Sequence, residues 1–357
     1  MALLGIDIGG TKLAAAVFTE EGEIISRDVT LLGNRGGKDA GALVAETVRN
    51  LISQKQNDGS RIRSIGISVP GIYRIKEGTV WAPNISGWDN YPLLQEVEAV
   101  CASISQADAW EGGTRDSMQH GPINAGEWHG HVQVTIESDR ACYILGEMWK
   151  GNARGCSNAI FLSVGTGIGA GILADGRILR GANDIAGAIG WLALSKPFRD
   201  EYVSCGCFEH HASGEGIAKV AVEYLKSETQ YAGELRNKPP EEITSHDVFD
   251  AYIKGDPLAD KVIRQSIEFW GMATANLISL FNPEKIIVGG GVFGPAVSLI
   301  PEIIEESARW AQPISSRMVS IEGSALGGDA GVYGAGWLAK EKLGGGELIM
   351  QSLEKNR

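Results

Sequence analysis

Two glycine-rich turns are candidate anion-binding sites. The first is DIGGTK at residues 7–12, and the second is SVGTGIG at residues 163–169. A glycine backbone can approach an anion closely, and successive amide N–H groups in such turns form a nest for phosphate oxygens. Either turn alone could also be a tight hairpin without a ligand. A third glycine cluster at residues 289–291 follows an apolar run, and the three together favour a polyphosphate held between two halves.

Two aspartates are candidates for phosphoryl-transfer chemistry. Asp7 precedes the first turn and is suited to hold Mg2+ through water, since Mg2+ usually takes few carboxylates and keeps several waters. Asp139 lies where the strand HVQVTI ends and a helix begins, which suits a base near an attacking hydroxyl. The alternative is that Asp139 or Ser138 simply caps that helix.

The elements around the turns exclude two common phosphate motifs. The opening reads as strands at residues 3–9, 13–18 and 24–29, so the glycine turn leads into a strand. The Rossmann fingerprint and the P-loop both require the turn to open a helix. A second unit of strand, glycine turn, strand and hairpin at residues 159–181 repeats this order, which predicts two related halves.

Helical periodicity and apolar runs predict the remaining elements. Residues 103–130 have no clean period, and such a stretch usually is a functional or mobile loop. Residues beyond 342 are expected to form a loose tail. Helices are predicted at residues 39–54, 91–102, 140–151, 214–226, 256–281 and 329–342, and strands at 285–294 and 317–323. A further helix is predicted between these two strands and ends at about residue 310.

Composition bounds the class of protein. The 357 residues predict two domains, and the net charge of −12 disfavours nucleic acid as a partner. The longest uncharged stretch, residues 155–174, is interrupted by polar residues and glycines, so no membrane span is expected. The N-terminus lacks the features of a secretory signal, and the five scattered cysteines suit a reducing cytoplasm.

Several motifs, in order, resemble the ROK family of sugar kinases, relatives of the actin and hexokinase ATPases. They are DIGGTK, APNISGW, ESD, GTGIGAGILADGRILRGANDIAG, FNPEKIIVGGG and LGGDAG, and they cover nearly residues 1–340. The resemblance implies an α/β protein with a two-domain actin-like ATPase (ribonuclease H-like) fold and an interdomain cleft. The domains are expected at residues 1–138 and 139–328, with a helix at about 329–345 packing back on the first.

The resemblance also implies ATP-dependent phosphorylation of a hexose, with Mg2+ bound alongside ATP. Asp139 would be the catalytic base, and Gly290 and Gly291 would lie near the adenosine. Sugar and ATP are therefore the expected partners, and a homodimer is one option for assembly. The phosphate ligands would be Gly9, Gly10, Thr11, Lys12, Gly165, Thr166 and Gly167, and the sugar ligands Gly71, Asn84, Ser138, Asp139, Trp191 and Glu209.

The expected sugar pocket departs from the family pattern. Ser138 replaces the usual Asn, and residues 188–191 (AIGW) replace Glu-x-Gly-His, so polar contacts to sugar hydroxyls are shortened or lost. Trp191 could stack its ring on a sugar face or be a core filler. The acceptor is therefore expected to be a glucose-like hexose whose identity the altered pocket does not fix. An N-acetylhexosamine and fructose are the alternatives.

The resemblance further implies a structural Zn2+ held by that His and by a C-x-C-G-x-x-G-C-x-E run. Here only Cys207 is in register with the retained Glu209, while Cys205 is not. Cys205, Cys207 and His210 or His211 would make only a weak metal pattern, so Zn2+ is not expected. His120, His129 and His131 beside the irregular segment are read as solvated.

Two functions other than that of a kinase are compatible with the family resemblance. A sugar-sensing repressor of this family would carry a winged helix-turn-helix before the first strand, whereas this sequence begins its strand at residue 2. A non-catalytic nucleotide- or sugar-binding protein would explain the altered pocket. Retention of Asp7 and Asp139 disfavours that alternative, because those carboxylates serve transfer rather than sugar affinity.

Overall fold

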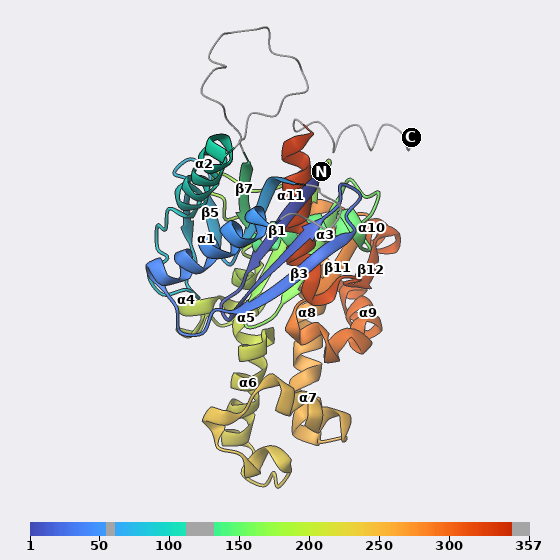
Figure 1. Ribbon diagram of the computed structural model, residues 1–357. Helices are drawn as coiled ribbons and strands as arrows, with labels where there is room; N and C mark the ends of the chain where they lie inside the picture. The colour runs from blue at the N-terminus through green and yellow to red at the C-terminus, as the bar shows by residue number, and fades with distance from the viewer. Residues whose placement is uncertain (55–60, 112–131, 345–357) are drawn as a thin grey trace. The chain divides into compact units, whose positions relative to one another are not determined.

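The computed structural model describes residues 1–54, 61–111 and 132–344. It divides into two compact units, and each is described by itself (Figure 1). The first unit comprises Met1–Lys150 and Asp329–Arg357, and the second comprises Gly151–Gly328. The first unit thus extends beyond residue 138, because the helix that follows packs against the helix at the chain's end.

The first unit is built on a five-stranded sheet of order β3-β2-β1-β4-β7. The strands β1, β2 and β3 are successive antiparallel neighbours, whereas β4 pairs parallel to both β1 and β7. The carboxyl ends of β1, β4 and β7 therefore meet at one edge of the sheet. The strands are β1 (Ala2–Ile8), β2 (Lys12–Phe18), β3 (Ile24–Leu31), β4 (Ile62–Val69) and β7 (Gln133–Ser138), with a separate hairpin of β5 (Ile72–Arg74) and β6 (Thr79–Trp81).

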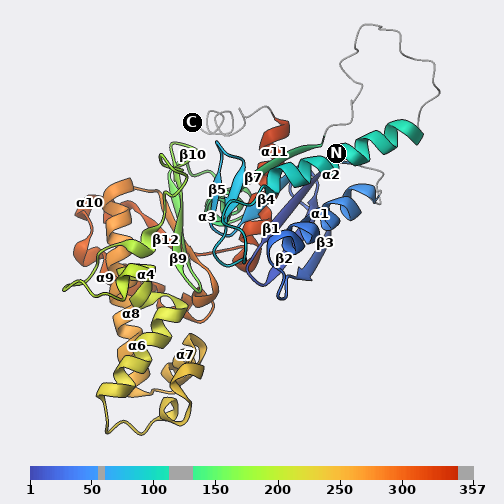
Figure 2. The ribbon, with the colours of Figure 1, turned by 90° about the vertical axis from the view of Figure 1, so that its left-hand side faces the viewer.

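Helices cover both faces of this sheet. The helices α1 (Gly37–Ser53) and α2 (Leu93–Glu111) pack on the face that receives Leu4, Ile6 and Ile8. The helices α3 (Asp139–Lys150) and α11 (Ala330–Leu343) pack together on the other face (Figure 2). Because side chains alternate along a strand, the small residues of β1 and β4 on that second face let α11 approach the sheet backbone closely.

The second unit repeats the sheet order of the first, as β10-β9-β8-β11-β12. The pairs β8/β9 and β9/β10 are antiparallel, and β11 is parallel to β8 and β12. This repetition agrees with the two related halves predicted from the glycine turns. The strands are β8 (Ala159–Val164), β9 (Ile168–Ala174), β10 (Arg177–Ile178), β11 (Lys285–Gly289) and β12 (Ser320–Gly323).

The core of the second unit lies between its sheet and several helices. Apolar residues of β8, β9 and β11 pack with those of the long helix α8 (Pro257–Phe281), around the fully buried Trp270. Asp256 caps α8 through its carboxylate, which accepts from two backbone N–H groups at 2.9 Å. The other helices are α4 (Tyr202–Cys205), α5 (Cys207–Ala212), α6 (Gly214–Ser227), α7 (Ser245–Ile253), α9 (Ile300–Trp310) and α10 (Pro313–Met318).

Two predicted elements differ from the structure. The helix α2 continues to Glu111, so residues 103–111 are helical rather than irregular. Residues 313–318 form α10, capped by the Gln312 side chain, so the last strand begins at Ser320. The rest of the irregular segment, residues 112–131 with His120, His129 and His131, and the tail beyond 344 lie outside the described residues. In the part that is described, no helix is long and apolar enough to span a bilayer.

We expect Gly66→Ala to destabilise the first unit. A Cβ built on Gly66 would lie 1.8 Å from the carbonyl oxygen of Ala335 in α11, so the helix would have to move. Such overpacking costs about 1–3 kcal/mol, which chemical denaturation would detect as a lower midpoint. Gly328→Ala is the control, because a Cβ there meets no atom of the described residues within 4 Å. Equal stability of the two variants would contradict the close packing of α11.

Candidate functional site

Asp7 lies near the end of β1, on the face that α11 covers. The hydroxyl of Ser68, its register partner on β4, donates to Asp7 Oδ1 at 2.6 Å. A Cβ on Gly331 would lie 2.5 Å from the Asp7 carboxyl carbon, so only glycine lets α11 begin there. Desolvation by the surrounding protein raises the pKa of Asp7 to about 6, and the charge of Asp139 acts in the same direction.

Asp139 is the first residue of α3 and follows β7 directly. Its Oδ1 accepts from the backbone N–H of Arg140 at 2.8 Å, and its Oδ2 accepts from the Tyr143 hydroxyl at 3.3 Å. Desolvation raises the pKa of Asp139, whereas Arg140 and these hydrogen bonds lower it. The carboxylate is therefore fixed in orientation and held in a form that accepts a proton more readily than an exposed aspartate.

Ser138 provides the cap of α3. Its hydroxyl oxygen accepts from the backbone N–H of Ala141 at 3.4 Å, and its own N–H donates to Glu137 Oε1 at 2.9 Å. The capping alternative therefore applies to Ser138. The Asp139 carboxylate instead bonds to the next backbone N–H and to Tyr143, so α3 does not depend on it for its cap.

Gly71 follows β4 and lies beside Asp139. Its N–H bonds to the Asp139 carboxylate and lowers the pKa of that group. Its carbonyl oxygen accepts from the Arg140 guanidinium at 3.4 Å. With φ at 116° and a built Cβ only 2.3 Å from the carbonyl oxygen of Trp81, this position requires glycine. The backbone of Gly71 therefore orients the carboxylate predicted to be catalytic.

The first glycine turn joins β1 to β2. The Gly9 N–H donates to the Lys12 carbonyl at 2.8 Å, which closes the turn and leaves Thr11 and Lys12 exposed. A Cβ on Gly10 would lie 3.3 Å from the Asn84 Cβ, so the turn and the expected sugar ligand are neighbours. The first unit thus brings one predicted phosphate turn beside one predicted sugar residue.

The second glycine turn, residues 165–167, joins β8 to β9. The Gly214 N–H at the start of α6 donates to the Gly165 carbonyl at 2.8 Å. A Cβ on Gly165 would lie 4.0 Å from the Gly291 nitrogen, so the turn and the predicted adenosine residues are adjacent. Gly290 has φ at 94° and packs against Val164. The exposed Thr166, the α6 N-terminus and this cluster form a surface suited to an anion.

Glu209 on α5 contacts the same turn. Its Oε2 accepts from the Ile168 N–H at 2.6 Å, and a Cβ on Gly167 would lie 2.7 Å from that oxygen. A Cβ on Gly190 would lie 3.0 Å from it. Desolvation raises the pKa of Glu209. Glu209 therefore connects the predicted phosphate turn with the segment that carries Trp191.

Trp191 ends a short 3-10 helix, and its side chain is 57% exposed. The interpretation as a core filler is therefore wrong. A Cβ on Gly206 would lie 2.6 Å from the Trp191 Cα, so its backbone packs against the residue before α5. The indole is exposed and thus available to a ligand, as stacking on a sugar would require.

Sequence reasoning missed Ser68, Tyr143 and Gly214. Ser68 could have been found, since a small polar residue near the end of a buried strand needs a partner. Tyr143 lies four residues after Asp139 on α3, the spacing at which helical side chains meet. Gly214 gave no signal, because its contact with Gly165 depends on how α6 packs.

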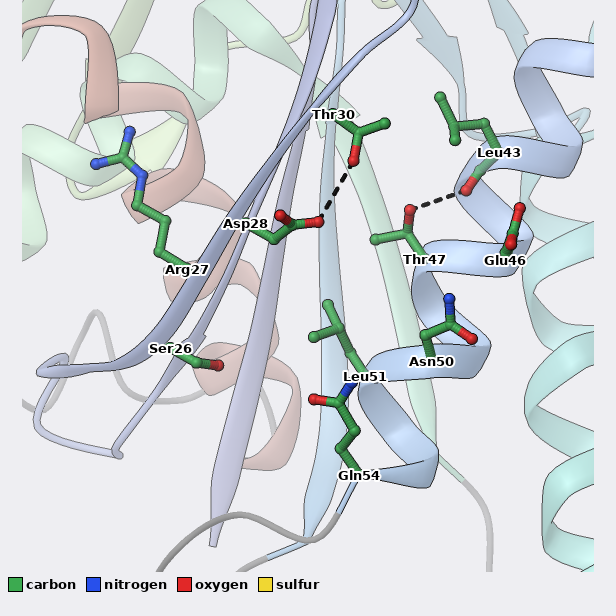
Figure 3. A pocket seen from close by; sticks show the side chains of 10 residues that line it. All are labelled: Ser26, Arg27, Asp28, Thr30, Leu43, Glu46, Thr47, Asn50, Leu51 and Gln54. Atoms are coloured by element: carbon green, nitrogen blue, oxygen red, sulfur yellow. Dashed lines mark hydrogen bonds between the residues drawn. The ribbon is translucent and has the colours of Figure 1, made fainter.

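A groove of about 480 Å3 lies on the opposite face of the first sheet from Asp7 (Figure 3). It opens between the edge strand β3 and α1, and Thr47 and Asn50 line it from the helix. Arg27 on its rim points away and pairs with Asp329 at 2.5 Å. None of the predicted site residues lines the groove, so it is not the predicted site.

We expect Asp7→Asn to stabilise the protein in a pH-dependent way. The folded pKa of about 6 lies above the ordinary value of 3.8, so ionisation of Asp7 opposes folding. Below about pH 4 Asp7 is protonated in both states, and the penalty grows until the pH passes about 6. At pH 7.5 the variant should gain roughly 1–3 kcal/mol in free energy of unfolding, and at pH 4 nothing.

Thermal and urea unfolding across this pH range would measure the gain. Asp28→Asn on β3 is the matched control, since Asp28 is exposed. If Asp7→Asn gained the same free energy of unfolding at pH 4 and pH 7.5, or lost some at pH 7.5, the surroundings of Asp7 would not destabilise its ionised form.

Comparison with known proteins identifies the family. The sequence profile of the ROK family matches residues 3–103 and 127–342. The chain is 30% identical to a glucokinase of Halalkalibacterium halodurans, over 95% of each chain. It is 28% identical to a beta-glucoside kinase of Listeria monocytogenes, over 94% of this chain and 96% of the relative.

A solved structure shares the fold. The ROK family glucokinase of Streptomyces griseus, in complex with glucose and AMPPNP, superposes with a TM-score of 0.70 at 26% identity. The superposition covers 96% of this chain and 100% of that one. It confirms the expected α/β fold with two actin-like domains. On the extent of the profile match and of the identity, this chain belongs to the ROK family.

Proposed function

We propose that this protein is an ATP-dependent hexose kinase that transfers the γ-phosphoryl group to a sugar hydroxyl. One observation carries the proposal: Asp139 is oriented by Gly71, Arg140 and Tyr143, close enough to Asp7 that its charge raises the Asp7 pKa. Two desolvated carboxylates at one sheet edge are costly for stability alone, which indicates a functional site. The relatives named glucokinase, and the one bound to glucose and AMPPNP, support the same reaction.

Asp139 would accept the proton of the attacking hydroxyl. A base is most effective when its pKa lies near the working pH, and desolvation moves that of Asp139 upward. The N–H of Gly71 and the hydroxyl of Tyr143 would hold the carboxylate while the proton arrives. Transfer of the phosphoryl group needs little else than positioning and neutralisation of charge.

The glycine turns would hold the phosphates. In the first unit Gly10 and Thr11 would offer backbone N–H groups beside the exposed ammonium of Lys12. Gly9, whose N–H bonds to the Lys12 carbonyl, would shape the turn. In the second unit Gly165, Thr166 and Gly167 lie beside the N-terminus of α6, whose dipole favours an anion. Gly290 and Gly291, next to that turn, would lie beside the adenosine part of ATP.

Asp7 would hold Mg2+ through water. Desolvation raises the pKa of Asp7, and the charges of Asp139 and Asp329 raise it further, so a divalent cation would favour the ionised carboxylate. Ser68 orients the carboxylate by binding Oδ1. Carboxylate oxygens that keep water between themselves and the ion suit Mg2+, which when bound would neutralise phosphate charge.

The acceptor would be glucose-like, with Asn84 and Glu209 as its polar ligands and Trp191 stacked on its ring. Ser138 would contribute little to sugar affinity, because its hydroxyl oxygen caps α3. An N-acetylhexosamine or fructose remains an alternative acceptor within the same proposal. A cytoplasmic location and a homodimer belong to this proposal as well.

We expect Asp139→Asn to lower kcat about 10²- to 10⁴-fold, because the amide cannot accept the proton. ADP release with Mg2+ and ATP, over a panel of hexoses, hexosamines and N-acetylhexosamines, would measure it. Asp28→Asn should leave the rate unchanged. Wild-type protein that turns over no sugar, or a variant as active as wild type, would favour the non-catalytic binding protein.

We expect Trp191→Ala to raise KM for the sugar roughly 5-fold, with kcat and the KM for ATP nearly unchanged, since an aromatic contact of this kind is worth about 1 kcal/mol. Steady-state kinetics with each substrate varied would separate the constants. Trp310→Ala is the matched control, because Trp310 on α9 is 63% exposed. Unchanged sugar KM in Trp191→Ala would show that the indole does not contact the acceptor.

A further inference from the structure

The short helix α5 carries residues that the family pattern links to zinc. Counted back from Glu209 and Cys207, the C-x-C-G-x-x-G-C-x-E pattern places its other two cysteines at Asp200 and Tyr202. Asp200 is exposed, whereas Tyr202 is 4% exposed. Within the described residues, no group of three His, Cys, Asp or Glu side chains is arranged to hold a metal ion. The donor set of this chain therefore does not fit the zinc that the resemblance implies.

A hydrogen-bonded chain of side chains occupies this region. The Tyr202 hydroxyl lies 2.7 Å from His211 Nε2, and Gln265 Nε2 lies 3.0 Å from His211 Nδ1. The Tyr224 hydroxyl donates to Gln265 Oε1 at 2.5 Å. These four residues come from α4, α5, α6 and α8, so the chain joins four helices. We call it the Tyr202–Tyr224 network.

The partners fix the tautomer of His211. The Gln265 amide nitrogen can only donate, so Nδ1 accepts and the ring proton lies on Nε2, which donates to the Tyr202 oxygen. Both ring nitrogens are then used, and neither lone pair is available to a metal. The His211 ring also stacks on Phe269 with centroids 4.4 Å apart, which fixes its plane.

His210 is no better placed as a ligand. Its Nε2 is buried and lies 3.5 Å from Glu223 Oε1, without a hydrogen-bond partner among the described residues. The Arg199 guanidinium binds that Glu223 carboxylate at 2.8 and 3.4 Å. A cation beside His210 would be repelled by Arg199, and one imidazole with one occupied carboxylate falls short of the four ligands of a structural zinc.

We infer that the Tyr202–Tyr224 network replaces the structural zinc of the family in this chain, and that it holds α5 in place without a metal. Zinc fixes a loop by binding several side chains at one point. Here Tyr202, at the position of a cysteine ligand, fixes the loop by bonding to His211 on the next helix. Gln265 and the Trp270 indole, which donates to the Ala212 carbonyl at 3.0 Å, then attach α5 to α8.

The network also positions Glu209, a statement that rests on the proposed function. Glu209 lies on α5 between Cys207 and His210, and its Oε2 accepts from Ile168 N–H at 2.6 Å. A shift of α5 would displace that carboxylate from the expected sugar site. Tyr202 and His211 are thus positioning residues, since neither is expected to touch the sugar.

The test combines metal content with thermal stability. Protein from zinc-supplemented growth should contain less than about 0.1 zinc per chain by mass spectrometry, and 1,10-phenanthroline should leave Tm unchanged. Tyr202→Phe keeps the ring but leaves the His211 N–H without its acceptor, so Tm should fall by roughly 3–8 °C. Tyr252→Phe on α7, outside the network, should not lower it. His211→Ala should lower Tm at least as far as Tyr202→Phe.

Two results would overturn the inference. One is a zinc ion per chain whose removal by phenanthroline lowers Tm. The other is a Tm of Tyr202→Phe equal to that of the wild type. Neither measurement needs a substrate, so both hold even if the kinase assignment fails. For an active kinase, Tyr202→Phe should raise the KM for the sugar several-fold and leave the KM for ATP unchanged. Equal changes in these two constants would refute the positioning of Glu209 by the network.

Discussion

The predicted site of the first unit depends on one electrostatic constraint: a desolvated aspartate, Asp7, lies near other carboxylates at the edge of the sheet. Asp7 lies where the charges of Asp139 and Asp329 both act on it, and it is partly withdrawn from water. A fold selected for stability alone would avoid such a group. Positive charge beside Asp7, such as that of a divalent cation that also binds phosphate oxygens, would offset this repulsion. Nucleotide and metal would thus complete the site electrostatically as well as chemically.

The repeated sheet order explains why two glycine turns occur in equivalent places. In both units an antiparallel hairpin adjoins a parallel strand, through β1/β2 with β4 and through β8/β9 with β11. The turn of each hairpin therefore lies at the edge where the parallel strands end, the edge at which α/β sheets usually bind ligands. Each unit adds its own chemistry there: Asp7 and Asp139 in the first, and the α6 N-terminus in the second.

Much of the fold could be predicted from local patterns. The strands around both glycine turns and the helix α8 follow directly from apolar periodicity and from turn or cap residues. The helix α10 was missed because RMVSIEG has strand-like residues, whereas Gln312 and Pro313 start a helix just before it. The prediction ends helix α2 too early, at residue 102, because Ser and Asp residues after that point weaken its apolar periodicity. The helix in fact continues to Glu111.

The site was only partly predictable, for a related reason. Residues within a motif, such as Asp7 and Asp139, could be found because their position relative to a strand end is local. Their partners are harder to predict, because Ser68 and Gly331 lie far from Asp7 in sequence and meet it only through packing. A buried polar residue such as Ser68 signals that it has a partner but not which one. The Tyr202–Tyr224 network likewise joins four helices that meet only through packing. The exposure of Trp191 likewise depends on the surrounding helices, so sequence left its role open.

The placement of α11 bears on how the chain matures during synthesis. This helix contributes to the first unit, where it packs on α3, β1 and β4, yet it is the last described helix of the chain. The second unit, Gly151–Gly328, is continuous and has all its segments before α11 leaves the ribosome. The nascent first unit must wait, with the Gly5 and Gly66 positions of its sheet not yet packed against a helix, until α11 has been synthesised. A nascent chain interrupted between Gly328 and α11 would therefore carry a first unit whose sheet lacks one of its covering helices.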